Sequence, residues 1–289
     1  MDIRGVVAFY IRYNFMAIKE QIQQKLFDDD SNTLLVHSDL MQGFEIPFKG
    51  RESFVISHTE ELLSLKKDLN VWMPAFNYDF CKGIGFDVKN TPSIVGPLTE
   101  YFRKNTADWR TSIPVFSFSG IGENPNLDFT NIIDPFGAKS AFHWLYEHNA
   151  SLMHYGSSLH SSTILHYAER MSNRLFYRYD KLFKGKIVQK DASSIDCEFN
   201  FHVRPMGKHL DYNWAKIESD LFDNNIVTQY QGGRTRILLC KIKELVDFWI
   251  SQINQNPLYL LDSESLLWVE PMIEKLGSPF LQSDFEIMK

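Results

Sequence analysis

Residues 140–171, SAFHWLYEHNASLMHYGSSLHSSTILHYAERM, decide the fold class because they contain a predicted helix, a strand and a second helix in close succession. The run SAFHWLYEHN has apolar side chains at helical spacing, SLMHYG is a short apolar strand, and STILHYAERM is again helical. Helices and strands that alternate at this length are typical of βαβ units, whose strands lie parallel in one sheet. The segment therefore predicts an α/β fold.

The same alternation extends toward the N-terminus. The predicted strands are TLLVH (33–37), VWMP (71–74) and VFSFSGIG (115–122). The predicted helices are MAIKEQIQQKLF (16–27), residues 51–67, and NTPSIVGPLTEYFRK (90–104). We expect Pro92 in the first turn of the last of these, where proline is well tolerated.

The pattern changes after about residue 174. IDCEFNFHV (195–203) alternates strictly and predicts a half-exposed antiparallel strand. Two amphipathic helices, residues 212–222 and 240–253, flank a predicted hairpin near QYQGGRTRILL (229–239). The prediction is a leader of residues 1–16, an α/β core of residues 17–174 with a mainly parallel sheet flanked by helices, and a smaller mixed α+β part of residues 175–289.

Composition excludes several classes of protein. The chain has 289 residues and a formal net charge of −6, without a basic cluster, which argues against a nucleic-acid partner. Three widely spaced cysteines offer neither a disulfide framework nor a zinc-ribbon spacing, and favour a reducing compartment. The apolar run GVVAFYI is too short for a membrane span, and no cleavage site follows it. We expect a cytoplasmic protein without a membrane partner. The sequence leaves a homodimer open.

His166 and Glu169 form the best candidate site. They are three residues apart in a predicted helix, so both lie on one face. A carboxylate beside an imidazole fixes its tautomer and raises its basicity, which suits a general base. Spacing alone leaves open a buried histidine that is hydrogen-bonded to a backbone carbonyl.

Two polar segments are further candidates. GSSLHSST (156–163) joins a strand to a helix, where backbone donors can meet an anion, or where Ser161, Ser162 or Thr163 can simply cap the helix. His37 and Ser38 close the first strand, at the end where parallel sheets border ligands; a solvated strand end is the alternative.

Weaker signals complete the survey. Cys81 is a nucleophile only if a histidine lies nearby, and is otherwise a small core residue. Arg234 and Arg236 in QGGRTR could meet a phosphate or belong to a plain hairpin turn. GIGF lacks the third glycine of a dinucleotide fingerprint. No HExxH or similar spacing occurs among the nine histidines, so we expect no metal.

Taken in order, these segments resemble the aminoglycoside 3-N-acetyltransferase family over roughly residues 17–252. The segments that carry the resemblance are LLVHSDL (34–40), VWMPAFNYDF (71–80), NTPSIVGPLTEYFRKNTADWR (90–110), DPFGAKSAFHWL (134–145), STILHYAER (162–170) and LFDNNIVTQYQGGRTRILLCKIKELVDFW (221–249). The resemblance implies a fold distinct from the GCN5-type acetyltransferases. It also implies an N-acyltransferase that takes its acyl group, acetyl by default, from coenzyme A by direct transfer.

The resemblance also implies roles for individual residues. His166 matches the family's general base, with Glu169 orienting it. Backbone N–H groups of residues 157–163 or the Ser38 hydroxyl would stabilise the oxyanion. The implied contacts to acetyl-CoA are His37, Ser38, Ser157, Ser158, Ser162 and Thr163. The implied contacts to the acceptor are Phe76, Tyr78, Arg110 and Ser117, with the C-terminal part completing that site.

One departure from the family pattern bears on the acceptor. Drug-modifying members carry a His-Pro-x-His-Ser pattern, but here Ile113 and Phe116 stand in the histidine places, while Pro114 and Ser117 are kept. The predicted pocket is therefore less polar. We expect an amine on a nucleotide-linked sugar for cell-surface polysaccharide, with an aminoglycoside resistance enzyme as the alternative. A non-enzymatic or thiol-dependent role that uses Cys81 is a third hypothesis.

Overall fold

The computed structural model describes residues 18–41, 51–127, 132–232 and 235–286. The predicted leader, residues 1–16, lies outside the described residues. Residues 18–28 form a helix, as the sequence predicts.

A seven-stranded sheet forms the centre of the molecule, in the order β10-β11-β7-β1-β2-β5-β4. Its strands are β1 (Thr33–Ser38), β2 (Asn70–Pro74), β4 (Trp109–Arg110), β5 (Phe118–Ile121), β7 (Ser151–Tyr155), β10 (Thr228–Gly232) and β11 (Thr235–Lys241). The α/β class is as predicted, but the sheet is mixed rather than mainly parallel. Only β7, β1 and β2 run parallel, and the other neighbouring strands of this sheet pair antiparallel. The C-terminal strands β10 and β11 belong to this same sheet.

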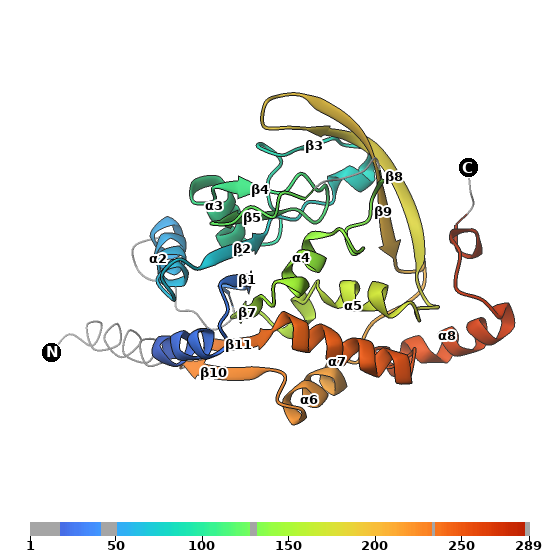
Figure 1. Ribbon diagram of the computed structural model, residues 1–289. Coiled ribbons are helices and arrows are strands. Elements are labelled where there is room, and N and C mark those ends of the chain that lie inside the picture. The colour runs from blue at the N-terminus through green and yellow to red at the C-terminus, as the bar shows by residue number, and fades with distance from the viewer. Residues whose placement is uncertain (1–17, 42–50, 128–131, 233–234, 287–289) are drawn as a thin grey trace.

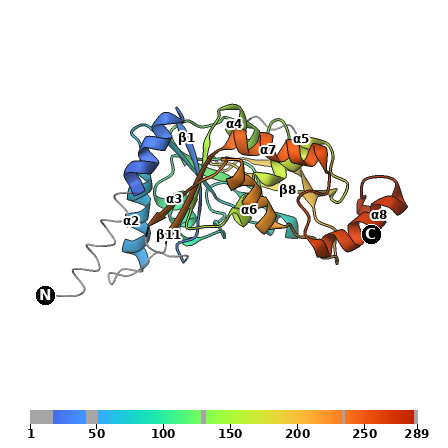
Figure 2. The ribbon, with the colours of Figure 1, turned by 90° about the horizontal axis from the view of Figure 1, so that it is seen from below.

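Helices cover both faces of the sheet (Figure 2). On one face lie residues 18–28, α2 (Arg51–Leu63) and α3 (Pro97–Asn105); on the other lie α4 (Ala141–Glu147), α5 (Leu165–Ser172) and α7 (Ile242–Gln255). The alternation of β1 explains the two layers, because Leu34 and Val36 enter one buried cluster and Leu35 enters the other. Each face of the sheet therefore has its own apolar core.

A second, four-stranded sheet has the order β3-β8-β9-β6. Its strands are β3 (Phe86–Asp87), β6 (Ile132–Ile133), β8 (Tyr179–Val188) and β9 (Ser194–Val203). The β8–β9 pair is a long antiparallel hairpin that arches along one side of the molecule (Figure 1). This confirms the antiparallel strand predicted from the alternation of residues 195–203.

The remaining elements lie toward the C-terminal end. α6 (Trp214–Asp223) packs onto the main core through Ile217 and Leu221. α8 (Ser263–Leu276) extends away from the body of the molecule in both ribbon views (Figures 1 and 2). Three short 3-10 turns, η1 (Asp79–Lys82), η2 (Leu159–Ser161) and η3 (Gln282–Asp284), complete the fold. Among the described residues, no helix is both long and apolar enough to cross a membrane.

Two predicted boundaries are wrong. α3 begins at Pro97, with Gly96 as its N-cap, so Pro92 lies upstream of the helix. β5 begins at Phe118, because Val115 adopts φ 67° and the Phe116 N–H donates to the Pro114 carbonyl at 2.8 Å. This is a tight three-residue turn of a rare and strained kind.

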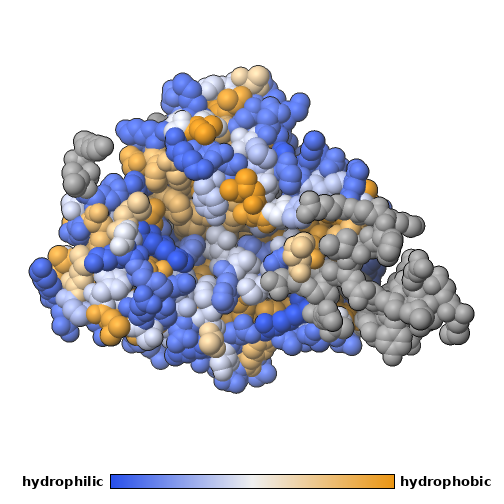
Figure 3. Space-filling view, turned by 180° about the vertical axis from the view of Figure 1, so that it is seen from behind, coloured by the Kyte–Doolittle hydropathy of each residue, from blue (hydrophilic) through white to orange (hydrophobic). Residues whose placement is uncertain are grey.

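Seen from behind, the molecular surface is hollowed near its middle, with apolar residues beside the hollow (Figure 3).

Candidate active site

A cavity of about 540 Å³ opens at the carboxyl ends of the three parallel strands. Seven of the predicted catalytic and contact residues line it: His37, Ser38, Phe76, Tyr78, Ser162, Thr163 and His166. The other lining residues are Pro74, Val95, Thr99, Phe116, His160, Ser161, Leu165, Phe201, Arg204, Asp211, Tyr212 and Trp214. Its volume lies within the range of ordinary small-molecule sites.

The His166 ring lines this cavity and contacts the carboxylate of Glu169 behind the cavity wall. Its Nδ1 lies 2.7 Å from Glu169 Oε2, and the His166 side chain is 24% exposed. A carboxylate can only accept a hydrogen bond, so Nδ1 carries the proton. Nε2 is therefore left with a free lone pair. The spacing-based pairing of the two residues is present in the structure.

Glu169 is completely buried, and four groups satisfy its charge. Tyr212 donates its hydroxyl to Oε1 at 2.6 Å and Tyr177 donates to the same oxygen at 3.2 Å. The buried guanidinium of Arg178 lies 3.3 Å from Oε2, and its other end donates to Tyr212. These partners come from three separate segments, so the carboxylate is held rigidly beneath the histidine.

The electrostatics favour a neutral histidine beside an ionised acid. Burial alone would raise the pKa of Glu169, but the charge of Arg178 and the hydrogen bonds from His166 and Tyr212 outweigh it and hold that pKa well below its usual range. Burial and the positive charge of Arg178 lower the pKa of His166, and the bond to Glu169 offsets them only in part. His166 is thus unprotonated near neutral pH and can accept a proton.

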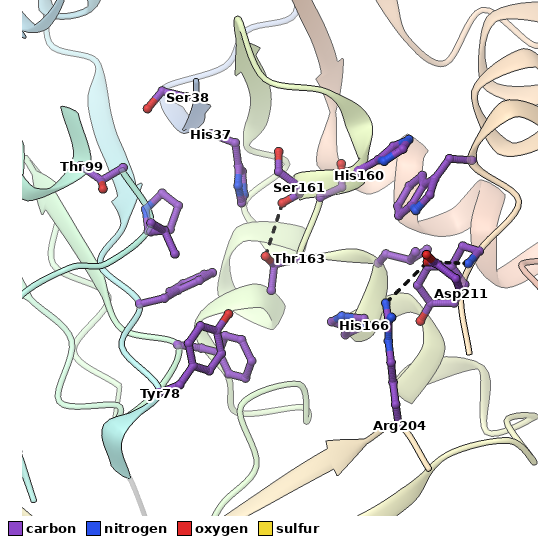
Figure 4. A pocket seen from close by; sticks show the side chains of 18 of the residues that line it. His37, Ser38, Tyr78, Thr99, His160, Ser161, Thr163, His166, Arg204 and Asp211 are labelled. Carbon is purple, nitrogen blue, oxygen red and sulfur yellow. Dashed lines mark hydrogen bonds and ion pairs between the residues drawn. The ribbon is translucent and has the colours of Figure 1, made fainter. Parts of the chain in front are cut away.

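Aromatic side chains form the wall opposite the histidine. Phe76 meets Phe116 edge-on with ring centroids 5.2 Å apart, and Phe116 meets Phe201 in the same way at 5.2 Å. The strained turn at Val115 leads directly into Phe116. Tyr78, labelled in Figure 4, also meets the Phe116 ring edge-on, with centroids 6.0 Å apart. Phe116 thus contributes an aromatic face to the cavity, whereas Ile113 is buried and does not line it.

Charged side chains gather near His166, at the other side of the cavity from Ser38 and Thr99 (Figure 4). Arg204 lies 3.9 Å from Asp211, and both side chains are about half exposed. Arg204 also donates to the Leu210 carbonyl at 2.9 Å and lies over the ring of Tyr212. Asp211 is the one carboxylate among the described residues that line the cavity.

The start of α5 differs from the prediction. Its N-cap residue is Ile164, and no side chain caps the helix, so the expected caps from Ser161, Ser162 or Thr163 are wrong. Ser162 is engaged elsewhere, with His154. The N–H groups of Ser161, Ser162 and Thr163 donate to carbonyls of the same segment. These three amides are therefore not free to bind an oxyanion.

Four implied contact residues do not line the cavity. Ser157 is buried and donates to the His37 carbonyl at 3.0 Å, while Ser158 is exposed at the start of η2. Arg110 is buried behind the wall, where its guanidinium donates to Ser117 Oγ and to three backbone carbonyls, including that of Ala75. Ser117 donates to the same Ala75 carbonyl at 2.7 Å. Arg110 and Ser117 thus brace the end of β2.

The competing nucleophile and phosphate hypotheses lose support. Cys81 does not line the cavity, and burial raises the pKa of its thiol to about 11, so the reactive thiolate is scarce at neutral pH. Arg236 donates to Gln229 at 2.7 Å and pairs with Glu218, and Arg234 lies outside the described residues. Within the described ranges, no group of three or more His, Cys, Asp or Glu side chains could hold a metal ion.

Sequence reasoning missed the residues that hold Glu169 and the charged end of the cavity. Tyr177 and Arg178 precede β8, and Arg204 follows β9. No motif marks these residues, because their role arises only when the C-terminal part folds against α5. The alternation of residues 195–203 did place Phe201 on the buried face of its strand.

Comparisons with known proteins identify one family model and several solved structures of similar fold. The family model described as aminoglycoside 3-N-acetyltransferase matches residues 54–254. The solved aminoglycoside acetyltransferase AAC(3)-IVa has a TM-score of 0.62 and 18% identity, over 84% of this chain and 91% of that one. AAC-IIIb, solved as a binary complex with CoASH, has a TM-score of 0.66 and 15% identity, over 82% of this chain and 96% of that one. YokD from Bacillus subtilis has a TM-score of 0.60 and 17% identity, over 83% of this chain and 94% of that one. No curated protein matches the sequence significantly.

Proposed function

The chain belongs to the aminoglycoside 3-N-acetyltransferase family and is an acetyl-CoA-dependent N-acetyltransferase, and we propose that it acetylates the amine of a nucleotide-linked amino sugar for cell-surface polysaccharide. One observation carries the proposed mechanism: His166 and the buried Glu169 meet at 2.7 Å in the wall of the cavity. We propose a cytoplasmic location, which the three free cysteines support.

In the proposed reaction His166 acts as the general base. A sugar amine is largely protonated at neutral pH and attacks only as the free base, so a group that removes its proton is needed. Acetyl-CoA supplies the thioester. The ammonium group loses one proton to solvent, and Nε2 of His166 takes a second proton as the amine nitrogen bonds to the carbonyl carbon. The C–S bond then breaks, and His166 returns the proton to the departing sulfur.

Thr163 is our candidate for the oxyanion donor. The amides of residues 161–163 are committed to local carbonyls, and Ser38 lies away from His166 in Figure 4, with Thr163 between them. The Thr163 hydroxyl makes only a long bond of 3.4 Å to the Ser161 carbonyl, so it can turn toward a developing negative charge. We assign Ser38, His37 and Ser162 to the binding of coenzyme A.

Charge in the cavity supports a nucleotide-linked sugar over an aminoglycoside. An aminoglycoside carries several ammonium groups, which call for several carboxylates. Among the described lining residues Asp211 is the one carboxylate, and Arg204 lies beside it. Glu169 does not line the cavity and is balanced by Arg178. A single amine together with an anionic group for Arg204 fits this balance better.

The C-terminal part completes the acceptor end in this proposal. Phe201, Arg204, Asp211 and Tyr212 all lie beyond residue 174 and line the cavity. Arg204 and Asp211 lie near His166 in Figure 4. The core supplies the His37 and Ser38 end, where coenzyme A would lie. The two substrates would thus enter from opposite ends of one cavity and meet at His166.

The mechanism is tested with His166→Ala and a matched control. We expect the turnover number to fall by about 10² to 10⁴, with coenzyme A binding nearly unchanged. The control is His160→Ala, because His160 lines the same cavity but stacks on Trp214 with ring centroids 4.8 Å apart. Near-normal turnover in His166→Ala would sink the mechanism.

The acceptor is tested by following thiol release from acetyl-CoA with panels of nucleotide-linked amino sugars and of aminoglycosides. We expect saturable turnover with the sugars. Arg204→Ala should raise the acceptor KM about tenfold and leave the acetyl-CoA KM unchanged, whereas the control Lys208→Ala, outside the cavity, should change neither. Saturable turnover of gentamicin-like drugs alone would establish the aminoglycoside alternative instead.

A further inference from the structure

A second cavity, of about 700 Å³, lies at the end of α3, beside β4 and the tip of the β8–β9 hairpin. These three elements lie at the same end of the molecule (Figure 1). The second cavity shares no lining residue with the cavity that His166 lines. Its volume is that of an ordinary small-molecule site.

The charged side chains of the second cavity are out of balance. Five of those that line it are cationic, and Glu100 is the one carboxylate among its described lining residues. Arg103 donates to both oxygens of Glu100 at 2.7 Å, so this pair is neutral. The other four cations have no ion pair with a described carboxylate: Lys89, Lys104, Arg110 and Lys190. The cavity thus gathers four unpaired positive charges in a chain whose net charge is −6.

Arg110 is the buried member of this set, with 7% of its surface exposed. Its guanidinium donates to three backbone carbonyls and to the Ser117 hydroxyl, which carry no counter-charge. Burial and then the charge of Arg103 lower the pKa of Arg110 to about 9, and the opposing charges of Glu100 and Asp87 do not offset them. Arg110 is therefore still charged at neutral pH. A buried charge without a counter-ion is costly, and an anion in this cavity would remove that cost.

Three lysines at the rim are available to the same anion. Lys89 and Lys104 are exposed and line the cavity. Lys190 lies in the turn of the hairpin, which is tied down because the Ser112 hydroxyl donates to the Gln189 side chain at 2.8 Å. The Lys190 ammonium makes only a long contact of 3.4 Å to a backbone carbonyl. It can therefore turn toward a ligand.

We propose that the second cavity binds a small anion with two phosphate groups, which neutralises Arg110 and is held by Lys89, Lys104 and Lys190. One phosphate group carries about −1.5 to −2 charges at pH 7, so two phosphates match the four unpaired cations. Phosphate oxygens also accept the short charge-assisted hydrogen bonds that arginine and lysine donate. Inorganic pyrophosphate and nucleoside diphosphates share this chemistry. The inference does not depend on the proposed acceptor, because the two cavities share no lining residue.

Arg110 also connects the second cavity to the wall of the active site. It donates to the Ala75 carbonyl at 2.8 Å, and the neighbours of Ala75 in the chain, Pro74 and Phe76, line the cavity beside His166. A bound anion therefore stabilises a residue that braces this wall. Because the anion binds the folded chain alone, it should also raise the Tm.

The test is titration calorimetry of the purified full chain with inorganic pyrophosphate in metal-free buffer. We expect saturable binding of one pyrophosphate per chain, which weakens as the salt concentration rises. Lys89→Ala and Lys104→Ala should each bind pyrophosphate about tenfold more weakly, and Lys104→Arg should stay within about threefold of wild type. The control is Lys67→Ala, because Lys67 is exposed and lies outside the cavity. Circular dichroism checks that each variant is folded.

Two further titrations identify the ligand and its location. Uridine 5′-diphosphate presents the same two phosphates as pyrophosphate, and the tighter binder of the two shows whether the ligand carries a nucleoside. Arg204→Ala should leave the pyrophosphate affinity unchanged, because Arg204 lines the cavity beside His166 and not the second one. A loss of pyrophosphate affinity in this variant would place the anion in the active site and overturn the inference.

Three other results would overturn it. The first is no saturable binding of either diphosphate to the wild type. The second is equal pyrophosphate affinity in the wild type, Lys89→Ala and Lys104→Ala. The third is a loss of acetyl-CoA affinity of about tenfold in Lys104→Ala, which would assign the second cavity to the phosphates of coenzyme A. Failure of the proposed acceptor in the turnover assay would leave the diphosphate site untouched.

Discussion

Among single acid-to-amide substitutions near His166, Glu169→Gln should cause the largest fall in the free energy of unfolding. The carboxylate accepts three hydrogen bonds, from the Tyr212 and Tyr177 hydroxyls on Oε1 and from His166 Nδ1 on Oε2, and Oε2 also forms an ion pair with Arg178. A glutamine is uncharged, and its NH₂ group cannot accept a hydrogen bond. Whichever way it turns, it removes the counter-charge of Arg178 and leaves at least one of these donors without its acceptor.

The size of the loss in unfolding free energy follows from the burial of Arg178. The Arg178 side chain is 3% exposed, and removing its counter-charge leaves a buried cation uncompensated. Breaking a buried pair in this way costs about 3–5 kcal/mol. Because the folded-state pKa of Glu169 is depressed, its contribution is fully present above the unfolded value of about 4.5 and is lost as the pH falls through the folded value. The penalty of the variant should therefore be complete at pH 7 and shrink below pH 4.5.

Urea unfolding followed by tryptophan fluorescence at pH 7 and at pH 4 measures this penalty. The control is Glu198→Gln, since Glu198 is 31% exposed and pairs with Lys184, which is 74% exposed. We expect the control to lose about 1 kcal/mol or less. A Glu169→Gln loss no larger than that of the control at pH 7 would refute the reasoning, as would a penalty that grows on acidification.

Three further predictions concern activity and the cavity wall. A plot of log kcat against pH should show its acidic inflection below 6.5, because burial and then Arg178 lower the pKa of His166; an inflection at or above 6.5 would contradict this. Arg110→Met should lower the free energy of unfolding in urea by about 3 kcal/mol, since three buried carbonyls and a hydroxyl lose their donor. A rise in the acceptor KM without loss of stability would instead indicate direct contact. Cys81→Ser should keep turnover within about twofold, as a thiol with a pKa of about 11 is a poor nucleophile, and loss of turnover would revive the thiol hypothesis.

Local patterns predict the elements well where a single periodicity dominates. β1, β2 and β7 follow from short apolar runs, and β9 follows from strict alternation. The start of α3 was misplaced because two prolines compete for the same role, and periodicity cannot choose between Pro92 and Pro97. The antiparallel pairing of β5 and β11 with the central strands was missed because the direction of a strand is not encoded in its own side-chain pattern.

The candidate site likewise has a part that the sequence predicts and a part that it does not. The meeting of His166 and Glu169 is local, three residues apart in one helix, so spacing could indicate it. Tyr212 is 43 residues from Glu169, and Arg178 lies beyond the end of the helix, where helical spacing no longer relates it to Glu169. His154 looks in the sequence like any residue of an apolar strand. Arg110 was assigned to the acceptor by its place in a motif, but its donors are consumed by the backbone that it supports.

The place of β11 has a consequence for the order in which the chain can fold. β11 pairs antiparallel with β7, so that Leu239 lies opposite Met153, and α7 then packs against α5 beside the cavity. A nascent chain that has emerged only as far as residue 174 would carry both His166 and Glu169, yet β7 would still have an open edge. Such an edge can pair with another chain. The His166–Glu169 pair can thus form its helix early, and Arg178 follows it closely in the chain, but the edge of β7 is closed only after β11 has been synthesised.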